Sequence, residues 1–414
     1  MRKTLIVLAA GLLLSACARD RYIRETPQPS LVEIGGVAML SMTTPRALHS
    51  ASILHDGRIL IAGGNRSSEI GGVLSSAEIF DPKTSDFVVT SEMTVQRQGH
   101  TATVLKDGRV LITGGTSNVG FRSELSSAEI YDPATGRFSP TGRMSTPREG
   151  HTATLLRDGR VLVAGGSPNG IVTTDSAEIY DPATGQFSVT GPLNRPREAH
   201  TATLLRDGKV LVAGGGRGGM PGGYVAFDTA EIYDPVSGTF SVLTSRMHGA
   251  RVGAGAAMLR DGRVLVVGGK TNRVGIVGGG IPSFAPLNTA DIFDPETNSF
   301  VRATPMGQAH YITVATALDN AQVLVTGGFL QQGPIVVGMK AADVYDPSLN
   351  AFFQPRQLRI GRLNQTATLL DSGLVMIAGG VDETSHVTAL VEFYDPTMRR
   401  FVASPIPHST AATE

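Results

Sequence analysis

The chain has 414 residues, of which 41% are hydrophobic and 17% charged. Lysine plus arginine and aspartate plus glutamate both number 36, which excludes a net field that would draw the whole molecule to nucleic acid or to an anionic membrane. The 50 glycines and 23 prolines require many tight turns between short apolar elements, and this composition favours an all-β fold.

The first residues follow the plan of an export signal. Arg2 and Lys3 form a basic start, residues 5–14 form an apolar stretch too short to span a bilayer, and "LSAC" (14–17) ends it. This pattern resembles the lipobox of bacterial lipoproteins, in which the cysteine is diacylated, becomes the mature N-terminus and anchors the protein in a membrane. The resemblance implies lipid attachment at Cys17.

Cys17 is the only cysteine of the chain, which favours the lipobox over an ordinary secretory signal cut one residue to either side. A single cysteine excludes an internal disulfide, so the core alone must hold the exported domain together. Asp20 does not directly follow the cysteine, so the usual inner-membrane retention signal of such lipoproteins is absent. We expect a signal peptide over 1–16, a tether over 17–30 that begins with the lipidated cysteine, and an outer-membrane anchor that faces the periplasm or the cell surface.

A short motif recurs along the rest of the chain. A Gly-Gly doublet that directly follows an apolar run such as "RVLVA" occurs seven times, and it begins at Gly63, Gly114, Gly165, Gly214, Gly268, Gly327 and Gly379. An aromatic-Asp-Pro triplet follows each doublet after a variable loop, and its aromatics are Phe80, Tyr131, Tyr180, Tyr233, Phe293, Tyr345 and Tyr394. Seven residues after each aromatic stands a phenylalanine: Phe87, Phe138, Phe187, Phe240, Phe300, Phe352 and Phe401. A spacing that stays fixed while the loops vary predicts a hairpin in every repeat.

Each repeat contains four strand signals. In the third repeat they are "HTATLL", "RVLVAGG", "SAEIYD" and "GQFSVT", between residues 151 and 190. Asp158-Gly159 predicts a two-residue type I′ turn between the first two strands. The "DPATG" segment predicts the last turn, with Gly185 in a left-handed conformation. The second strand is apolar without alternation, so both of its faces should be buried.

The doublet, the tyrosine and the later aromatic resemble the kelch family of β-propellers. The resemblance covers residues 43–406 and implies an all-β, seven-bladed β-propeller of four-stranded antiparallel kelch blades. The family usually has tryptophan at the last aromatic position, whereas this chain has none and keeps phenylalanine there. The expected units are 43–93, 94–144, 145–193, 194–247, 248–306, 307–358 and 359–406, followed by a tail over 407–414.

The sequence does not decide how the ring closes. The segment that contains residues 31–42 ends in "MTTPR", much as the third repeat is preceded by "MSTPR". Residues 31–42 are therefore predicted to add a strand to the last blade and so close the ring. The last unit also carries its own fourth strand signal, "RRFVASPI", so one segment is redundant or the last sheet is irregular. The repeat count predicts seven blades, with six or eight as alternatives.

A basic residue stands seventeen positions before each doublet. These residues are Arg46, Arg97, Arg148, Arg197, Arg251, His310 and Arg362. They precede the strand that lines the channel of a propeller, where such a ring is suited to binding a carboxylate, sulfate or phosphate. The "AEIYDP" motif carries one acid per repeat: Glu78, Glu129, Glu178, Glu231, Asp291, Asp343 and Glu392. We favour pairing of these acids with the basic residues as architecture, and we keep ligand binding as the alternative.

Histidines recur at the start of the first strand in four repeats and are replaced in the last three. They are His49, His100, His151 and His200. Residues in separate blades diverge from the axis, whereas a metal needs ligands that converge on one point. We expect structural histidines, and no metal or other cofactor.

The loops after the doublets differ between repeats. Those of the fourth to sixth repeats are long and carry apolar side chains, including Tyr224, Phe227, Phe284 and Phe329. Mobile apolar loops on one face are typical of a partner-binding surface. The alternative is that these loops fold over the channel and plug it.

The sequence favours a non-catalytic binding module for an envelope or extracellular protein or glycan, most simply a monomer. Copper radical oxidases of the galactose-oxidase type resemble the kelch fold, but they need a cysteine cross-linked beside the metal, and Cys17 belongs to the signal. The alternative is an exported carbohydrate enzyme of the sialic-acid mutarotase type, with His310 as acid or base. An unpaired acid beside His310 would favour that alternative, whereas seven equivalent pairs would count against it.

Overall fold

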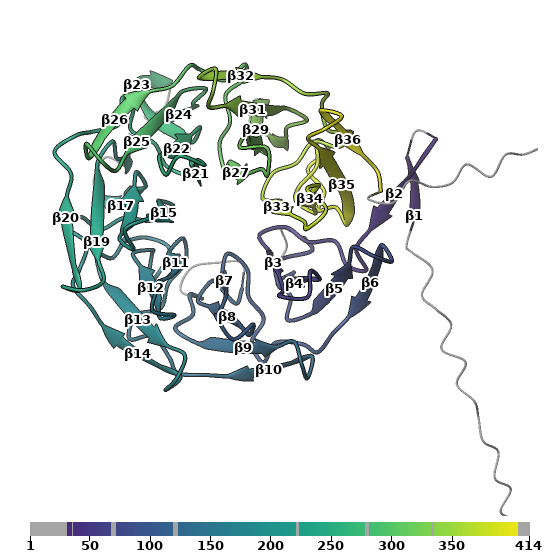
Figure 1. The fold of residues 1–414 in the computed structure, drawn as a ribbon, viewed down its shortest axis with the longest axis horizontal. Helices are drawn as coiled ribbons and strands as arrows, with labels where there is room; N and C mark the ends of the chain where they lie inside the picture. The colour runs from purple at the N-terminus through teal and green to yellow at the C-terminus, as the bar shows by residue number, and fades with distance from the viewer. Residues whose placement is uncertain are drawn as a thin grey trace, which may run out of the picture.

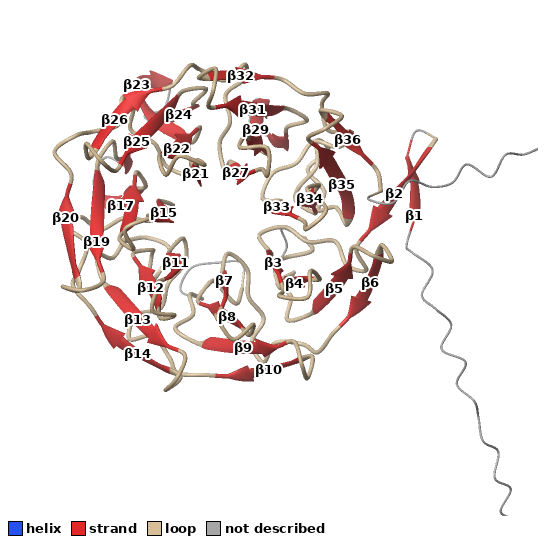
Figure 2. Cartoon of the chain, in the orientation of Figure 1, coloured by secondary structure: helices blue, strands red, loops and turns tan. Residues whose placement is uncertain are grey.

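Every repeat forms a four-stranded antiparallel sheet in the computed structural model, which describes residues 31–34, 36–67, 72–118, 123–220, 223–277, 281–332 and 335–404. Seven sheets surround a central axis and form the expected seven-bladed β-propeller (Figure 1). The described residues are strands, turns and loops (Figure 2), and among them no helix is long and apolar enough to cross a membrane. Cys17, the tether and the tail over 407–414 lie outside the described residues.

The blades follow one another in chain order. In each blade the first strand lies next to the central axis and the fourth lies at the rim (Figure 1). Their bounds are β3 (Ser50–Ile53), β4 (Ile59–Ala62), β5 (Ala77–Asp81) and β6 (Asp86–Val89) in blade 1; β7 (Thr101–Val104), β8 (Val110–Thr113), β9 (Ala128–Asp132) and β10 (Arg137–Pro140) in blade 2; β11 (Thr152–Leu155), β12 (Val161–Ala164), β13 (Ala177–Asp181) and β14 (Gln186–Val189) in blade 3; β15 (Thr201–Leu204), β16 (Val210–Ala213), β19 (Ala230–Asp234) and β20 (Thr239–Val242) in blade 4; β21 (Gly255–Met258), β22 (Val264–Val267), β25 (Ala290–Asp294) and β26 (Ser299–Arg302) in blade 5; β27 (Val314–Ala317), β28 (Val323–Thr326), β31 (Ala342–Asp346) and β32 (Ala351–Phe353) in blade 6; and β33 (Thr366–Leu369), β34 (Val375–Ala378), β35 (Leu390–Asp395) and β36 (Arg400–Val402) in blade 7. Two N-terminal strands, β1 (Leu31–Ile34) and β2 (Val37–Ser41), join blade 7.

The core fills the spaces between neighbouring blades. Every residue of β12 is buried, as the unbroken apolar run predicts. Leu162 and Ile179 of blade 3 pack against Val210, Val212 and Tyr233 of blade 4. Burying one such aliphatic side chain contributes about 1.5–3 kcal/mol. Equivalent clusters join the other blades, including blade 7 to blade 1, so the ring is closed by packing.

The turn after the first strand differs from the expected type I′ turn. The amide N–H of Gly159 donates to the carbonyl of Leu156, and Leu156 donates to the carbonyl of Arg160, which makes a three-residue loop. Gly159 has φ 95°, and Asp158 is not among the residues with positive φ. The type I′ prediction is therefore wrong: the turn is a type I turn followed by a glycine bulge. The carboxylate of Asp158 accepts the N–H of Arg160 at 3.0 Å and thereby fixes the loop.

The outer hairpin is held by the two aromatics that the spacing singled out. Tyr180 of β13 lies directly opposite Phe187 of β14, and their ring centroids are 4.9 Å apart. Gly185 adopts φ 68° in the connecting turn, as expected. The same ring pair occurs in all seven blades, with centroids 4.7 to 5.2 Å apart. Phenylalanine thus supplies the packing that tryptophan usually supplies at this position.

Blade 7 uses both segments that compete for its edge. Strand β36 pairs with the C-terminal half of β35, where Phe401 lies opposite Tyr394. Strand β2 pairs with the beginning of β35, where Leu40 lies opposite Val391, and the N–H of Met42 then donates to Ala389 at 2.9 Å. Neither segment is redundant: the last sheet is irregular and has six strands, the two halves of its edge coming from opposite ends of the chain.

Candidate functional site

One face of the propeller carries three added hairpins, and we call it the hairpin face. They are β17 (Gly216–Met220) with β18 (Gly223–Ala226) in blade 4, β23 (Lys270–Val277) with β24 (Ile281–Pro286) in blade 5, and β29 (Phe329–Gln332) with β30 (Ile335–Gly338) in blade 6. Each begins directly after a Gly-Gly doublet and belongs to the connection between the second and third strands of its blade. The long loops of the sequence are therefore hairpins rather than irregular segments.

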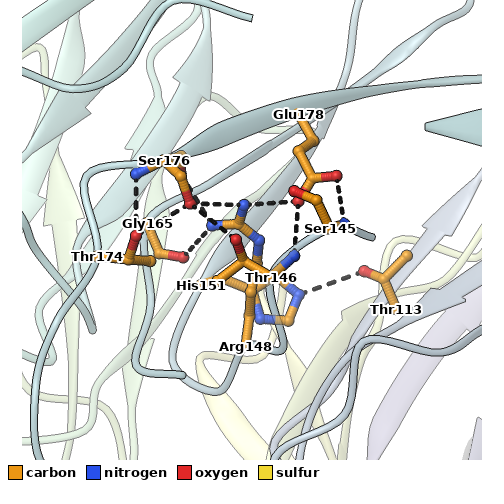
Figure 3. A network of polar contacts seen from close by, with 9 residues as sticks. All are labelled: Thr113, Ser145, Thr146, Arg148, His151, Gly165, Thr174, Ser176 and Glu178. Carbon is orange, nitrogen blue, oxygen red and sulfur yellow. Dashed lines mark hydrogen bonds and ion pairs between the residues drawn. The ribbon is translucent and has the colours of Figure 1, made fainter. Parts of the chain in front are cut away.

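A buried arginine lies beneath this face in every blade except blade 6. In blade 3, Arg148 donates to the carbonyls of Gly165 and Ser176, both at 2.8 Å, and to the Glu178 carboxylate at 2.8 Å (Figure 3). The other carboxylate oxygen of Glu178 accepts the backbone N–H of Ser145 at 2.8 Å. The pair therefore joins the connection that enters the blade to the doublet and to the third strand.

The same pairing occurs in all seven blades. The distances between basic nitrogen and carboxylate oxygen are 2.9 Å for Arg46–Glu78, 2.8 Å for Arg97–Glu129, 2.8 Å for Arg148–Glu178, 2.7 Å for Arg197–Glu231, 2.5 Å for Arg251–Asp291, 2.9 Å for His310–Asp343 and 3.1 Å for Arg362–Glu392. His310 also bonds the carbonyl of Gly327 at 2.7 Å, in the place where the arginines bond the other doublets.

These contacts match the architectural role. All seven basic side chains are at most 1% exposed, and their carboxylate partners are as deeply buried. Burial lowers the pKa of the arginines, although the carboxylates oppose the shift. A guanidinium that is already bonded to a carboxylate and two carbonyls beneath the surface presents no exposed donor to a solute. We therefore assign these residues to the framework and place no ligand on them.

The histidines link the first strands of neighbouring blades. The Nε2 atom of His200 lies 2.9 Å from Oγ1 of Thr152 in the preceding blade, and that of His49 lies 3.0 Å from Oγ1 of Thr366 across the closure. Their rings pack against the doublet of the preceding blade: a Cβ placed on Gly165 would lie 2.9 Å from Cε1 of His200. Among the described residues there is no group of three or more histidine, cysteine, aspartate or glutamate side chains that could hold a metal ion.

Burial sets the charge of these histidines. Desolvation and, to a smaller extent, the nearby arginine charges lower the pKa of His49, His151 and His200 to about 3. Burial lowers the pKa of His100 in the same way. All four rings are therefore neutral in the folded protein at neutral pH.

Backbone hydrogen bonds run from blade to blade around the channel mouth. The second residue after each buried basic residue has φ between 48° and 64°: Leu48, Gly99, Gly150, Ala199, Gly253, Ile312 and Asn364. This left-handed conformation turns the N–H toward the preceding blade. Gly253 donates to Ala199 at 2.9 Å and Ile312 donates to Gly253 at 3.1 Å. Branched Ile312 is strained there, since side chains such as isoleucine rarely adopt positive φ.

Two positions in each blade carry side chains whose class differs from blade to blade. One directly follows the buried basic residue and the other directly follows the doublet, and in several blades the two form a β-bridge, as in Glu149 with Ser167 and Val252 with Lys270. In blades 1 to 4 they are mostly polar: Asn65, Gln98, Thr116, Glu149, Ser167 and Glu198. In blades 5 to 7 they are mostly apolar or aromatic: Val252, Lys270, Tyr311, Phe329, Leu363 and Val381. These two positions are thus mostly polar in one half of the ring and mostly apolar in the other.

An aromatic cluster joins blades 5 and 6 on the apolar half. The rings of Tyr311 and Phe329 meet edge to face with centroids 5.0 Å apart, and Nζ of Lys270 lies 4.3 Å from the centre of the Tyr311 ring. All three side chains are half-buried. Burial raises the pKa of Tyr311 to about 12 and lowers that of Lys270. The cluster offers a partner an aromatic edge with a cation already placed against it.

The sequence over residues 48–269, more than half of the chain, matches the family model of the KLHDC2/KLHL20/DRC7 Kelch-repeats domain. The chain is a Kelch-repeat protein.

Relatives of this Kelch-repeat protein match it over part of their length. Spermatocyte protein spe-26 of Caenorhabditis elegans is 31% identical over 131 residues, which are 30% of this chain and 22% of that protein. Adagio-like protein 1 of Oryza sativa subsp. japonica is 30% identical over 167 residues, 36% of this chain and 26% of the relative. Kelch-like protein 36 of Bos taurus is 27% identical over 149 residues, 36% of this chain and 21% of the relative. The chain spans about a quarter of these curated proteins.

Solved structures share the Kelch fold at low identity. A fungal alcohol oxidase of the AA5 family in complex with copper aligns with a TM-score of 0.66 and 15% identity, over 89% of this chain and 78% of that one. The structure of YjhT aligns with a TM-score of 0.58 and 14% identity, over 76% of this chain and 99% of that one. These likenesses show the fold alone.

The apolar residues singled out from the sequence lie on the hairpins of the Kelch propeller. Phe227 follows β18 with its ring 5.8 Å from Cζ of Arg195 and 5.5 Å from Cζ of Arg197, and Phe329 belongs to the aromatic cluster. The side chains of Tyr224 and Phe284 lie outside the described residues. Sequence reasoning missed Tyr311 and Lys270. Their signal was available, because the residues beside His310 and after the fifth doublet change class from repeat to repeat.

Proposed function

We propose that this Kelch-repeat protein is an exported, lipid-anchored, non-catalytic module that binds a protein partner through its hairpin face. The supporting observation is the asymmetry of that face. Seven equivalent blades need only a short connection between their second and third strands, yet three adjacent blades raise two-stranded hairpins beside an aromatic cluster. Side chains such as Tyr311 and Phe329 are of the type that anchors protein interfaces.

Binding is supported over the alternative, a carbohydrate enzyme of the mutarotase type. That alternative requires His310 to meet a substrate beside an unpaired acid. His310 is fully buried and bonded to Asp343 and to the Gly327 carbonyl, in the place that an arginine takes in the other six blades. A general acid or base must reach the atom that it protonates or deprotonates, so the position of His310 argues against that reaction.

The anchor is proposed from the sequence of residues 1–17. Expression in bacteria that process lipoproteins, followed by mass spectrometry of the N-terminal peptide, should detect a diacylated Cys17. The variant Cys17→Ser should lose the acyl groups and leave the membrane fraction. An unmodified or uncleaved N-terminus in the wild type would refute the anchor and leave the hairpin face unaffected.

The hairpin face is tested by site-specific photo-crosslinking in intact cells. A benzophenone amino acid at Phe329 is compared with one at Val236, which is 96% exposed in the turn after β19 on the opposite face. We expect a discrete protein adduct from position 329 that weakens at least tenfold when Tyr311→Ala is added, and none of that size from position 236. Equal adducts from both positions, or an adduct indifferent to Tyr311, would refute the assignment. A periodate-sensitive adduct would indicate a glycan instead.

A further inference from the structure

A basic groove lies on the rim where the ring closes. It has a volume of about 410 Å³ and is lined by Arg356 and Arg359 of the connection from blade 6 to blade 7, by Arg400 of β36 and by Val37 of β2. We call it the closure groove. Figure 1 shows β36 and β2 beside one another at this edge of the ring.

The charges of the closure groove are not neutralised by ion pairs. Arg356, Arg359 and Arg400 are all exposed, and none pairs with a carboxylate in the described part of the chain. The acids nearest in sequence are engaged elsewhere: Glu392 is buried against Arg362, and the Asp395 carboxylate accepts the N–H groups of its own turn. Exposed arginines in the first-strand turns behave differently. Arg58, Arg109, Arg160 and Arg263 each pair with an aspartate two residues earlier.

The groove also lies where the N-terminal segment joins the ring. Val37 begins β2, and the hairpin partner β1 starts at Leu31. Leu31 and Val32 of this hairpin are each 43% exposed. Thirteen residues lie between Cys17 and Leu31, and the fourteen Cα-to-Cα steps span at most about 50 Å when fully extended. A lipid on Cys17 therefore brings this edge of the propeller, before any other, within reach of the membrane.

We propose that the closure groove binds the phosphate groups of anionic lipids and docks the propeller on the membrane by its rim. The forked N–H donors of three arginines match phosphate oxygens, and the polybasic edge adds to the hold of a single lipidated residue. In this orientation the propeller axis lies along the membrane surface, which leaves the hairpin face open to a partner. The inference rests on the proposed lipid anchor for its membrane, but the groove is testable without the lipid.

The test uses the mature chain with Cys17→Ser, which carries no acyl group, in co-sedimentation with vesicles. Vesicles of phosphatidylcholine alone are compared with a mixture of phosphatidylcholine and phosphatidylglycerol. The groove variant is Arg356→Gln/Arg359→Gln/Arg400→Gln. The control is Arg137→Gln/Arg143→Gln/Arg157→Gln, which removes three exposed arginines from blades 2 and 3 with the same change of net charge. Thermal melts of both variants establish that the ring remains folded.

We expect binding to the anionic vesicles only, and a loss of about fivefold per groove arginine, on the order of 100-fold in the groove variant. The control variant should bind within about twofold of the parent, and added salt should weaken binding of the parent. Equal losses in both variants would refute the groove and indicate diffuse attraction. Competition by inorganic phosphate beyond that of chloride at equal ionic strength would refute the membrane and leave a free-phosphate site. An acylated wild type whose lipid-free form ignores anionic vesicles would refute the groove and leave the anchor standing.

Discussion

The buried histidines between the blades make the stability of the propeller depend on pH in a calculable way. The pKa of His200 is about 3 in the folded protein, against an ordinary value of about 6.5 in the unfolded chain. Because the folded pKa is the lower one, only the unfolded state takes up a proton between these values. The contribution of His200 is present above about pH 6.5 and is lost as the pH falls toward 3, at about 1.4 kcal/mol per pH unit.

The size of the effect follows from these two pKa values. At about pH 5, protonation of one histidine in the unfolded chain costs the folded state about 2 kcal/mol relative to pH 8. His49, His151 and His200 have the same low pKa and together cost about 6 kcal/mol, comparable with the whole stability of many domains. The change that isolates one of them is His200→Gln, because Gln365 occupies the equivalent position in blade 7.

The assay is urea unfolding of wild type and His200→Gln at about pH 8 and pH 5, followed by circular dichroism and tyrosine fluorescence, since the chain has no tryptophan. We expect the free energy of unfolding to fall between the two pH values by about 2 kcal/mol less in the variant than in the wild type. His55→Gln, at an exposed histidine, controls for the substitution itself. If wild type and His200→Gln lose the same free energy, the neutral buried histidine is not what makes the fold sensitive to acid.

Three further substitutions test the framework. Arg148→Met should lower the free energy of unfolding by about 3–5 kcal/mol, because it leaves the buried Glu178 carboxylate without its cation. The double variant Arg148→Met/Glu178→Met should recover part of this loss. A loss below about 1 kcal/mol for the single variant in urea unfolding would contradict the pairing. Tyr180→Phe should lower the free energy of unfolding by less than about 1 kcal/mol, since it removes only the hydroxyl hydrogen bond to Thr141 at 2.9 Å. Blades 1 and 5 already carry phenylalanine at this position. A larger loss of stability in a thermal melt would mean that the hydroxyl matters more than the ring packing. Ile312→Gly should stabilise the ring by about 1 kcal/mol, because glycine relieves the left-handed backbone strain at φ 57°. A lower melting temperature of the variant would show that the isoleucine side chain contributes more stability than the strain removes.

Much of the framework could be predicted from the sequence because each repeat is governed by local rules that act seven times. The unbroken apolar run of residues 161–163 predicted a strand buried on both faces, and the spacing between Tyr180 and Phe187 predicted their hairpin. The turn at Gly159 was mistaken because Asp-Gly suits both a type I′ turn and a bulged type I turn. The number of residues between paired positions decides between them, and that register is a property of the folded sheet.

The candidate site was harder to predict. Burial of Arg148 depends on the neighbouring connection and third strand, and an arginine looks the same in sequence whether it faces solvent or a buried carboxylate. The aromatic cluster brings Tyr311 of one connection against Phe329 of a later hairpin and Lys270 of the preceding blade. The six-stranded closing sheet was likewise undecided, because two segments with equal strand signals share one edge.

The shared edge of β35 also governs the order in which the molecule can be made. Leu40 finds its partner Val391 roughly 350 residues later in the chain, so β2 has no edge to join until the last repeat has been synthesised. Six blades can stack as they emerge, but the seam joining the first to the last waits for the whole polypeptide. A chain cut short before β35 would retain most of its blades and still expose two apolar sheet faces. The completed seam therefore marks a finished ring.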